Sequence, residues 1–208
     1  MKKNKGLLLS FLRYDWWKII GTYGICAAFL ALMFNYKDKL KDEEILDIFI
    51  TGTINDSSFQ QKLFEDVPND KILAIHSYPF SIDNHQYNQV SNANISSVAD
   101  LFILPESVLN SHREYFTYAK EITDLDNISS SYSFLDDSNF KNRGIKIFDK
   151  DNNDFNQGKL FSSWFDFSET SYLFVSSVST NSNDKNADGK NLLLEYAYSF
   201  LRLGLHKK

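Results

Sequence analysis

The stretch Asp100-Leu101-Phe102-Ile103-Leu104 decides the fold class of this chain. Its four apolar residues follow one another without a polar residue between them, which is the pattern of a strand buried on both faces of a sheet. Pro105 ends the strand, and Glu106-Ser107 begins a helical pattern in which Val108 and Leu109 are apolar. A strand of this kind is covered on both sides, so the stretch predicts a sheet between two layers of helices.

Strand and helix patterns alternate through the rest of residues 37–208. Short apolar or β-branched runs predict strands, and apolar residues at helical spacing predict the helices between them. The predicted strands are 45–51, 71–78, 100–104, 144–148 and 172–178, and the predicted helices are 56–68, 84–97, 106–116 and 190–203. Such alternation favours right-handed crossovers between parallel strands. We therefore predict an α/β fold class, with a single three-layer domain and a mostly parallel sheet.

An apolar run without charge precedes this domain at residues 19–36, IIGTYGICAAFLALMFNY. As a helix it would extend over roughly 27 Å, close to the thickness of a hydrocarbon core of about 30 Å. Trp16, Trp17, Tyr23 and Tyr36 lie near its ends, and aromatic rings favour the headgroup level of a bilayer. The run predicts a single N-terminal transmembrane helix.

Charges on either side of the run predict its orientation. Residues 1–36 hold five cations and one anion, a net charge of +4, and all five cations precede the run. Lysines and carboxylates are mixed after it. Because cationic flanks stay on the cytoplasmic side, we expect residues 1–18 to be a cytoplasmic basic tail, 19–36 to span the cell membrane, and 37–208 to lie outside.

Two alternatives to this uncleaved anchor remain open. A cleaved signal peptide would end in a small-residue cleavage site, whereas the run continues into Phe34-Asn35-Tyr36-Lys37. A bacterial lipoprotein would carry a small residue directly before its lipidated cysteine, whereas Ile25 precedes Cys26. The uncleaved anchor fits the sequence best.

Charge and cysteine content exclude several functions for residues 37–208. Of the total net charge of −5, this part carries −9, because residues 1–36 carry +4. Such an acidic domain argues against nucleic acid as a partner. Cys26 is the only cysteine of the chain, so the outer part can form no disulfide, thiol nucleophile or thiolate metal site.

Three segments resemble the first lobe of a type 2 extracellular solute-binding protein. They are a first strand that ends in glycine at 47–52, the sequence DLFILPES at 100–107, and a late strand that continues through 176–183 into a helix at 192–201. The sequence FLRYDWWK at 11–18 is similar to that of small membrane-anchored proteins of Gram-positive bacteria that bear this lobe. The resemblance implies a solute-binding-like lobe within residues 7–203.

A complete protein of that family has two lobes that close on a ligand. Here only about 40 residues, between Phe102 and Gly144, could supply a second lobe, so we expect one lobe with an open face. Ligands of parallel sheets bind outside the carboxyl ends of the strands. The candidate residues for contact with a ligand or partner at those ends are Gly52, Thr53, Tyr78, Phe80, Glu106 and Ser107.

The loop before the last helix matches a calcium-binding pattern. Asp184, Asn186, Asp188 and Gly189, with Glu195 in the twelfth position, fit D-x-[DN]-x-[DN]-G-x5-E. Carboxylate and amide oxygens are the ligands that calcium prefers. The same residues also fit a polar loop that caps the final helix, because a predicted strand rather than a helix precedes them. Calcium is the only cofactor that the sequence suggests.

No catalytic constellation is recognisable in the sequence. The four histidines lack metal-ligand spacing, and no nucleophile elbow, phosphate-binding glycine loop or dinucleotide fingerprint occurs. We therefore expect a non-catalytic, membrane-anchored interaction or transporter-accessory module whose partner is a membrane or envelope protein. Capture of a small solute at the strand ends is the alternative, and an enzyme of unknown chemistry is the third hypothesis.

Overall fold

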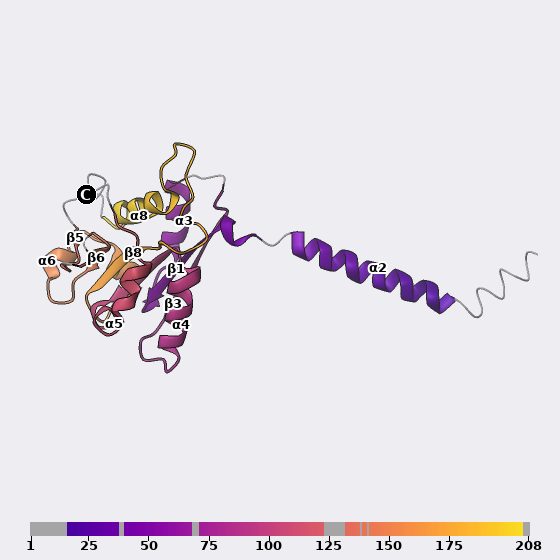
Figure 1. Ribbon diagram of the computed structural model, residues 1–208, viewed down its shortest axis with the longest axis horizontal. Helices are drawn as coiled ribbons and strands as arrows, with labels where there is room; N and C mark the ends of the chain where they lie inside the picture. Colours follow the sequence, from indigo (N-terminus) through magenta and orange to yellow (C-terminus); the bar gives the residue numbers. More distant parts are fainter. Residues whose placement is uncertain are drawn as a thin grey trace, which may run out of the picture. The chain divides into compact units, whose positions relative to one another are not determined.

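The computed structural model describes residues 16–37, 40–67, 71–122, 132–137, 139–140 and 142–205. The chain divides into two units, Met1–Lys41 and Asp42–Lys208 (Figure 1). In the first unit, α2 (Trp16–Lys37) is one helix of 22 residues. Among the described residues, no helix combines the length and the apolar character that crossing a membrane requires. Residues 1–15 of the predicted basic tail, and the side chains of 16, 17, 19 and 31–37, lie outside the described part.

A mixed sheet forms the centre of the second unit. Within the described residues its six strands lie in the order β3 (Ala74–Phe80), β1 (Ile45–Thr51), β4 (Leu101–Pro105), β8 (Ser171–Val175), β6 (Gly144–Phe148) and β5 (Ser133–Phe134). β1 is parallel to both β3 and β4. β8 is antiparallel to its two neighbours β4 and β6, and β5 is antiparallel to β6. Four of these six strands thus share one direction, as expected for a mostly parallel sheet.

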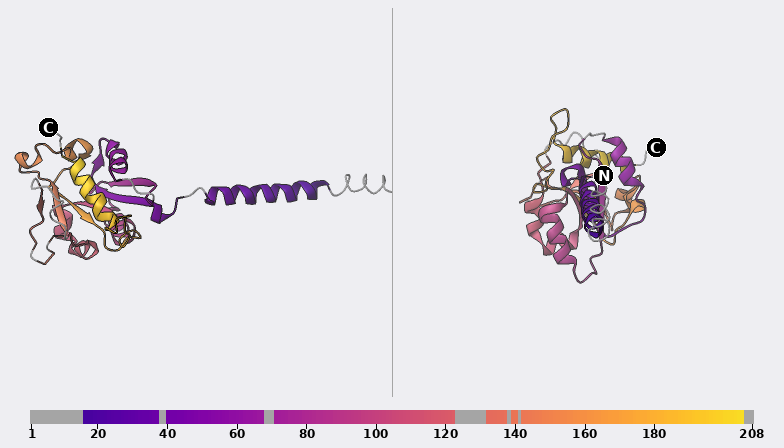
Figure 2. Two further views of the ribbon diagram at one scale, coloured as in Figure 1. Left: turned by 90° about the horizontal axis from the view of Figure 1, so that it is seen from above. Right: turned by 90° about the vertical axis from the view of Figure 1, so that its right-hand side faces the viewer.

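Helices cover both faces of this sheet (Figures 1 and 2). Because side chains alternate between the two faces of a strand, Ile48 and Ile50 pack under α3 (Ser58–Asp66) and α8 (Leu192–Leu203), whereas Phe49 faces the other layer. That layer consists of α4 (Tyr87–Ala93), the π-helix η2 (Asn94–Val98), α5 (Glu106–Ser111) and the 3-10 helix η3 (Arg113–Tyr118). The two separate apolar clusters give the domain three layers.

Aromatic rings fill the core beneath α8. The ring of Phe59 on α3 lies 5.0 Å from Phe165 and 5.9 Å from Phe200, both in edge-to-face contact, an arrangement that aromatic pairs prefer. Trp164 closes α7 (Phe161–Trp164) and lies 5.9 Å from Phe59. Trp164 and Phe165 are each only 1% exposed, so these rings stabilise the core.

Several predicted elements end at other residues than the sequence indicated; the strand predicted over 172–178, for example, is β8 (Ser171–Val175). The strand predicted to stop before Pro79 continues through it to Phe80. β3 is an edge strand with β1 as its one neighbour, and an edge tolerates a proline without a free N–H. The helix predicted over 106–116 is divided at His112, whose φ of −131° and ψ of 66° separate α5 from η3.

Candidate functional site

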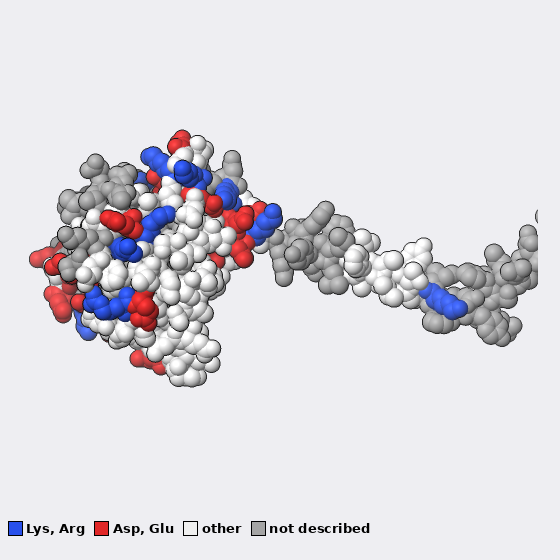
Figure 3. All heavy atoms as spheres, viewed as in Figure 1, with Lys and Arg blue, Asp and Glu red and all other residues white. Residues whose placement is uncertain are grey.

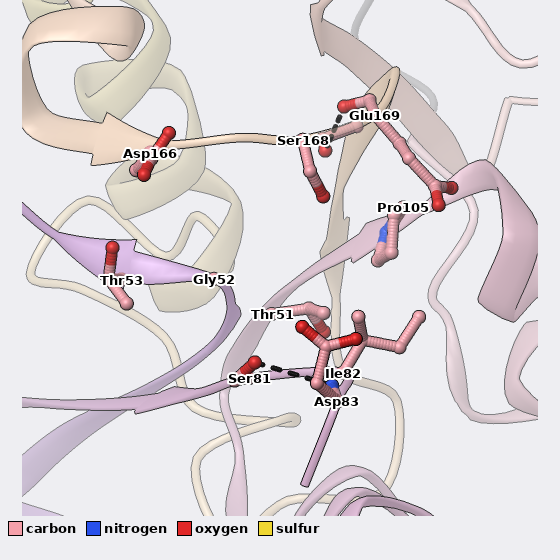
Figure 4. A pocket seen from close by; sticks show the side chains of 11 residues that line it. Thr51, Gly52, Thr53, Ser81, Ile82, Asp83, Pro105, Asp166, Ser168 and Glu169 are labelled. Carbon is pink, nitrogen blue, oxygen red and sulfur yellow. Dashed lines mark hydrogen bonds between the residues drawn. The ribbon is translucent and has the colours of Figure 1, made fainter.

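A cavity of about 180 Å³ lies at the carboxyl ends of β1, β3 and β4 (Figure 4). Thr51 and Pro105 are the last residues of β1 and β4, and Ser81 directly follows β3. The parallel strands therefore bring their ends together here, as sheets of this class do at their ligand sites. We call this space the strand-end cavity; it is lined by Thr51, Gly52, Thr53, Ser81, Ile82, Asp83, Pro105, Asp166, Ser168, Glu169 and Ser171.

A small second sheet closes one side of the strand-end cavity. β2 (Thr53–Ile54) pairs antiparallel with β7 (Phe165–Asp166), and Thr53 lies opposite Asp166. Gly52 makes the turn into β2 with a φ of +136°, a conformation that side chains rarely adopt. A Cβ at this position would lie 2.9 Å from the carbonyl oxygen of Asp166. Glycine is therefore required for the close approach of the two chain segments.

Every ionisable side chain that lines the strand-end cavity is acidic. Asp83, Asp166 and Glu169 are the three carboxylates, and none of the described residues in the lining is a lysine, arginine or histidine. Glu169 is held in place, because its Oε2 accepts a hydrogen bond from the backbone N–H of Ser107 at 3.3 Å. The Ser81 hydroxyl oxygen accepts from the N–H of Asp83 at 3.3 Å (Figure 4). This arrangement favours a group that carries positive charge and donates hydrogen bonds.

The six residues predicted at the strand ends lie in different places. Gly52 and Thr53 line the strand-end cavity. Ser107 reaches it through its hydrogen bond to Glu169. The N–H of Glu106 donates to the carbonyl oxygen of Thr170 at 2.9 Å. Tyr78 and Phe80 do not line this cavity.

The sequence predicts a strand end near Tyr78 and Phe80 because Pro79 indicates a stop. Since β3 continues to Phe80, Tyr78 lies about 7 Å before its carboxyl end, at roughly 3.3 Å per residue. Tyr78 lines a different pocket, with Asp47 and His76. The ring of Phe80 lies 6.3 Å from that of Tyr87 and packs against the core.

The carboxylates of the strand-end cavity were missed by sequence reasoning. Asp83 would have been found if β3 had been extended past Pro79, because it comes just after the true strand end. No local sequence pattern around Asp166 and Glu169 indicates that they belong to a site. They reach the cavity only because β7 pairs with β2, a contact between segments far apart in the chain.

The predicted calcium loop is held by contacts within the protein. Asp184 Oδ2 lies 2.6 Å from Lys71 Nζ. Asn186 Oδ1 accepts from the N–H groups of Asp188 and Lys190, each at 3.0 Å. Among the described residues, no group of three or more His, Cys, Asp or Glu side chains is placed to hold a metal ion. Calcium binding by Asp184, Asn186, Asp188 and Glu195 stays a prediction, which melting with and without millimolar calcium would test.

Charge is unevenly distributed over the surface of the second unit. Figure 3 shows acidic and basic side chains interspersed on one face, with a broad uncharged area beside them. Residues 84–99, which include α4 and η2, hold no Asp, Glu, Lys or Arg.

Comparison with known proteins shows one weak likeness in structure. No family model matches the chain, and no curated protein matches it. Among solved structures, it is similar to the spermidine/putrescine ABC transporter substrate-binding protein PotD from Streptococcus pneumoniae, with 16% identity and a TM-score of 0.33. The match covers 50% of this chain and 32% of that one. The chain thus spans about a third of that protein.

Proposed function

We propose that residues 42–208 form a non-catalytic interaction module whose strand-end cavity accepts a basic side chain of a protein partner. The acidic lining supports this proposal, because Asp83, Asp166 and Glu169 surround the cavity and the lining residues that the structure describes include no cation. A volume of about 180 Å³ is below the roughly 300–1,000 Å³ of ordinary small-molecule pockets. It suits one side chain of a partner that contacts the surrounding face.

We also propose that the module is anchored in the cell membrane, with its N-terminus in the cytoplasm and residues 37–208 outside. This part of the proposal rests on the sequence, namely the uncharged run at 19–36 and its basic N-terminal flank. We expect the partner to be a membrane or envelope protein, because such proteins lie beside residues 37–208 in this topology. The module would then act as an accessory to a transporter.

Photocrosslinking in membranes tests the partner. Benzoylphenylalanine at Thr53, an exposed residue at the cavity, should yield an adduct with a protein. The triple variant Asp83→Asn, Asp166→Asn, Glu169→Gln should lose that adduct, because it removes the charges but retains similar side-chain volumes. Glu121→Gln, an exposed carboxylate outside the cavity, is the matched control and should retain it. A Thr53 probe that yields no protein adduct, or one unaffected by the triple variant, would contradict the proposal.

Capture of a free small cation at the same cavity is the alternative function. The acidic lining favours such a solute as well, but an open single-lobe face would leave much of it in water, whereas good sites bury about 70–90% of a ligand. We expect no small solute to bind this cavity more tightly than about 1 mM. Calorimetry of the full chain against panels of amines, sugars, amino acids and peptides checks this. Micromolar binding that the triple variant abolishes would favour capture over a protein partner.

A further inference from the structure

The outer edge of β3 has no neighbouring strand within the part of the chain that the structure describes. On its inner edge, all seven residues of β3 pair with β1, from Ala74 opposite Ile45 to Phe80 opposite Thr51. A free edge is a template for an added strand, and natural proteins often protect it with charged side chains or proline. β3 contains no Asp, Glu, Lys or Arg, and its one proline, Pro79, lies near its end. Most of this edge is therefore open to pairing.

The alternation of the strand indicates which backbone groups are free. The carbonyl oxygen of Phe80 accepts from the N–H of Gly52 at 3.1 Å, so the backbone groups of Phe80 face β1. Because successive residues of a strand present these groups to opposite edges, those of Ile75, Ser77 and Pro79 face outward. Proline fits this placement, since it is tolerated where its nitrogen faces solvent. The free edge thus offers the N–H groups of Ile75 and Ser77 and the carbonyl oxygens of all three residues.

An uncharged groove of about 220 Å³ lies beside this edge, between β3 and α3. Its described lining comes from one side of α3 and from the start of β3, and consists of Gln60, Gln61, Phe64, Leu73, Ala74 and Ile75. Phe64 is 39% exposed and Leu73 is 49% exposed. Apolar side chains that stay in water beside an open strand edge indicate a surface for another chain, because an extended peptide there would cover them.

Charge and backbone pattern both favour a foreign peptide over a second copy of this chain. Residues 37–208 carry a net charge of −9, so two copies repel each other. If two β3 strands paired antiparallel about a two-fold axis, an outward carbonyl group of each would face Pro79 or Leu73. Pro79 has no N–H, and the N–H of Leu73 already donates to the carbonyl oxygen of Glu44 at 2.7 Å. An ordinary peptide has a free N–H at each of these positions.

We propose that the free edge of β3 binds an extended, uncharged peptide segment of a protein partner as an added strand. The main chain of the peptide pairs with Ile75, Ser77 and Pro79, and one of its apolar side chains enters the groove beside Phe64 and Leu73. In this mode of recognition the main-chain hydrogen bonds supply affinity, and the side chains at alternate positions supply specificity. The groove shares no residue with the strand-end cavity, so this inference does not rest on the proposed function.

Calorimetric titration of the full chain in detergent tests the site with matched peptides. A blocked hexapeptide of alternating threonine and valine should bind with a dissociation constant below about 1 mM. The same hexapeptide with every backbone nitrogen methylated keeps the side chains but lacks the N–H donors, so it should bind at least about tenfold more weakly. A hexapeptide of alternating threonine and glutamate has the donors but carries charge, and should be weakened similarly. Absence of binding by the first peptide, or equal binding of the methylated one, would overturn the proposal.

Substitutions of Ser77 locate the binding. Ser77→Pro removes an outward N–H at an edge that tolerates proline, and it should weaken binding of the threonine–valine peptide at least about tenfold. Ser77→Ala loses the hydroxyl, which accepts from Gln60 Nε2 at 2.6 Å, but keeps the N–H. As the matched control it should leave the affinity within about twofold. Equal losses in the two variants would refute main-chain pairing.

Two further measurements complete the test. Thermal melting shows whether the variants fold, and Phe64→Ser, which changes an exposed wall of the groove, provides the result if Ser77→Pro does not fold. It should weaken peptide binding at least about threefold, and unchanged binding would contradict the proposal. Sedimentation of the full chain examines the other occupant. A dimer that Ser77→Pro abolishes would assign the edge to a second copy and overturn the inference.

Discussion

The Asp100 carboxyl lies in an environment that differs strongly from water, since it is only 2% exposed. Burial raises its pKa from 3.8 to about 6, although hydrogen bonds from the Asp47 N–H, from Ser179 and from Asn181 lower it. Burial also raises the pKa of the neighbouring Asp47. The folded protein therefore binds more protons than the unfolded chain between these pH values, and Asp100 destabilises the fold once it ionises.

From this shift we predict a stability that falls as pH rises. Because its pKa is raised, Asp100 favours the folded state while it is protonated. The free energy of unfolding should therefore fall by about 3 kcal/mol between pH 4 and pH 6, for a shift of about two pKa units. Asp100→Asn retains an acceptor oxygen and has no charge, so its free energy of unfolding should lack this decline. Urea titrations of both proteins at pH 4, 5, 6 and 7 measure it. Parallel curves for the two proteins would show that Asp100 keeps an ordinary pKa.

Gly52 allows a second prediction for a single residue. Gly52→Ala should lower the free energy of unfolding by about 1–3 kcal/mol, because φ is +136° and the new Cβ would lie 2.9 Å from the carbonyl oxygen of Asp166. Gly158→Ala is the matched control, since its φ is also positive, at +74°, but a Cβ would meet nothing within 4 Å. Chemical denaturation compares the two. Equal losses would mean that the contact with β7 adds nothing to the backbone strain.

At the scale of single elements, α8 has a clear N-cap. Oδ1 of Asn191 accepts from the N–H of Leu194 at 3.2 Å, and its Nδ2 donates to the carbonyl oxygen of Ser182 at 2.9 Å. Asn191→Ala should therefore destabilise the protein by about 1 kcal/mol, the usual value for a lost cap. Asn186→Ala changes the same loop without removing this cap. If thermal melting ranks Asn186→Ala as the more damaging change, the loop rather than the cap holds the start of α8.

Local patterns predicted most elements of this fold. β1 and β6 lie where their apolar runs indicated, and α3 and α8 begin within two residues of the predicted starts. Periodicity locates such elements because each has one buried face. The antiparallel insertion of β8 between β4 and β6 depends on tertiary pairing, which no local pattern carries.

The candidate sites were predicted less completely than the fold, for the same reason. Gly52 and Thr53 could be found because they follow a strand directly. Asp166 and Glu169 enter the strand-end cavity through the pairing of β2 with β7. The buried hydrogen bond from Asn181 to Asp100 likewise joins residues 81 positions apart in the chain. The sequence alone indicates where strands end. Which residues line a pocket at those ends depends on the segments that the fold places beside them.

At the scale of the whole molecule, the membrane proposal makes a prediction about topology. Cationic residues precede the uncharged run at 19–36, and the part that follows carries a net charge of −9. Lysine and arginine are retained on the cytoplasmic side during insertion, so the acidic unit 42–208 should face outward. Protease added to intact cells stripped of any wall should then degrade this unit and leave residues 1–18 protected.

A cytoplasmic protein that remains intact in the same cells is the control for their integrity. Protection of the acidic unit would refute the orientation, and a mature N-terminus within residues 25–40 would show that the run is a cleaved signal rather than an anchor.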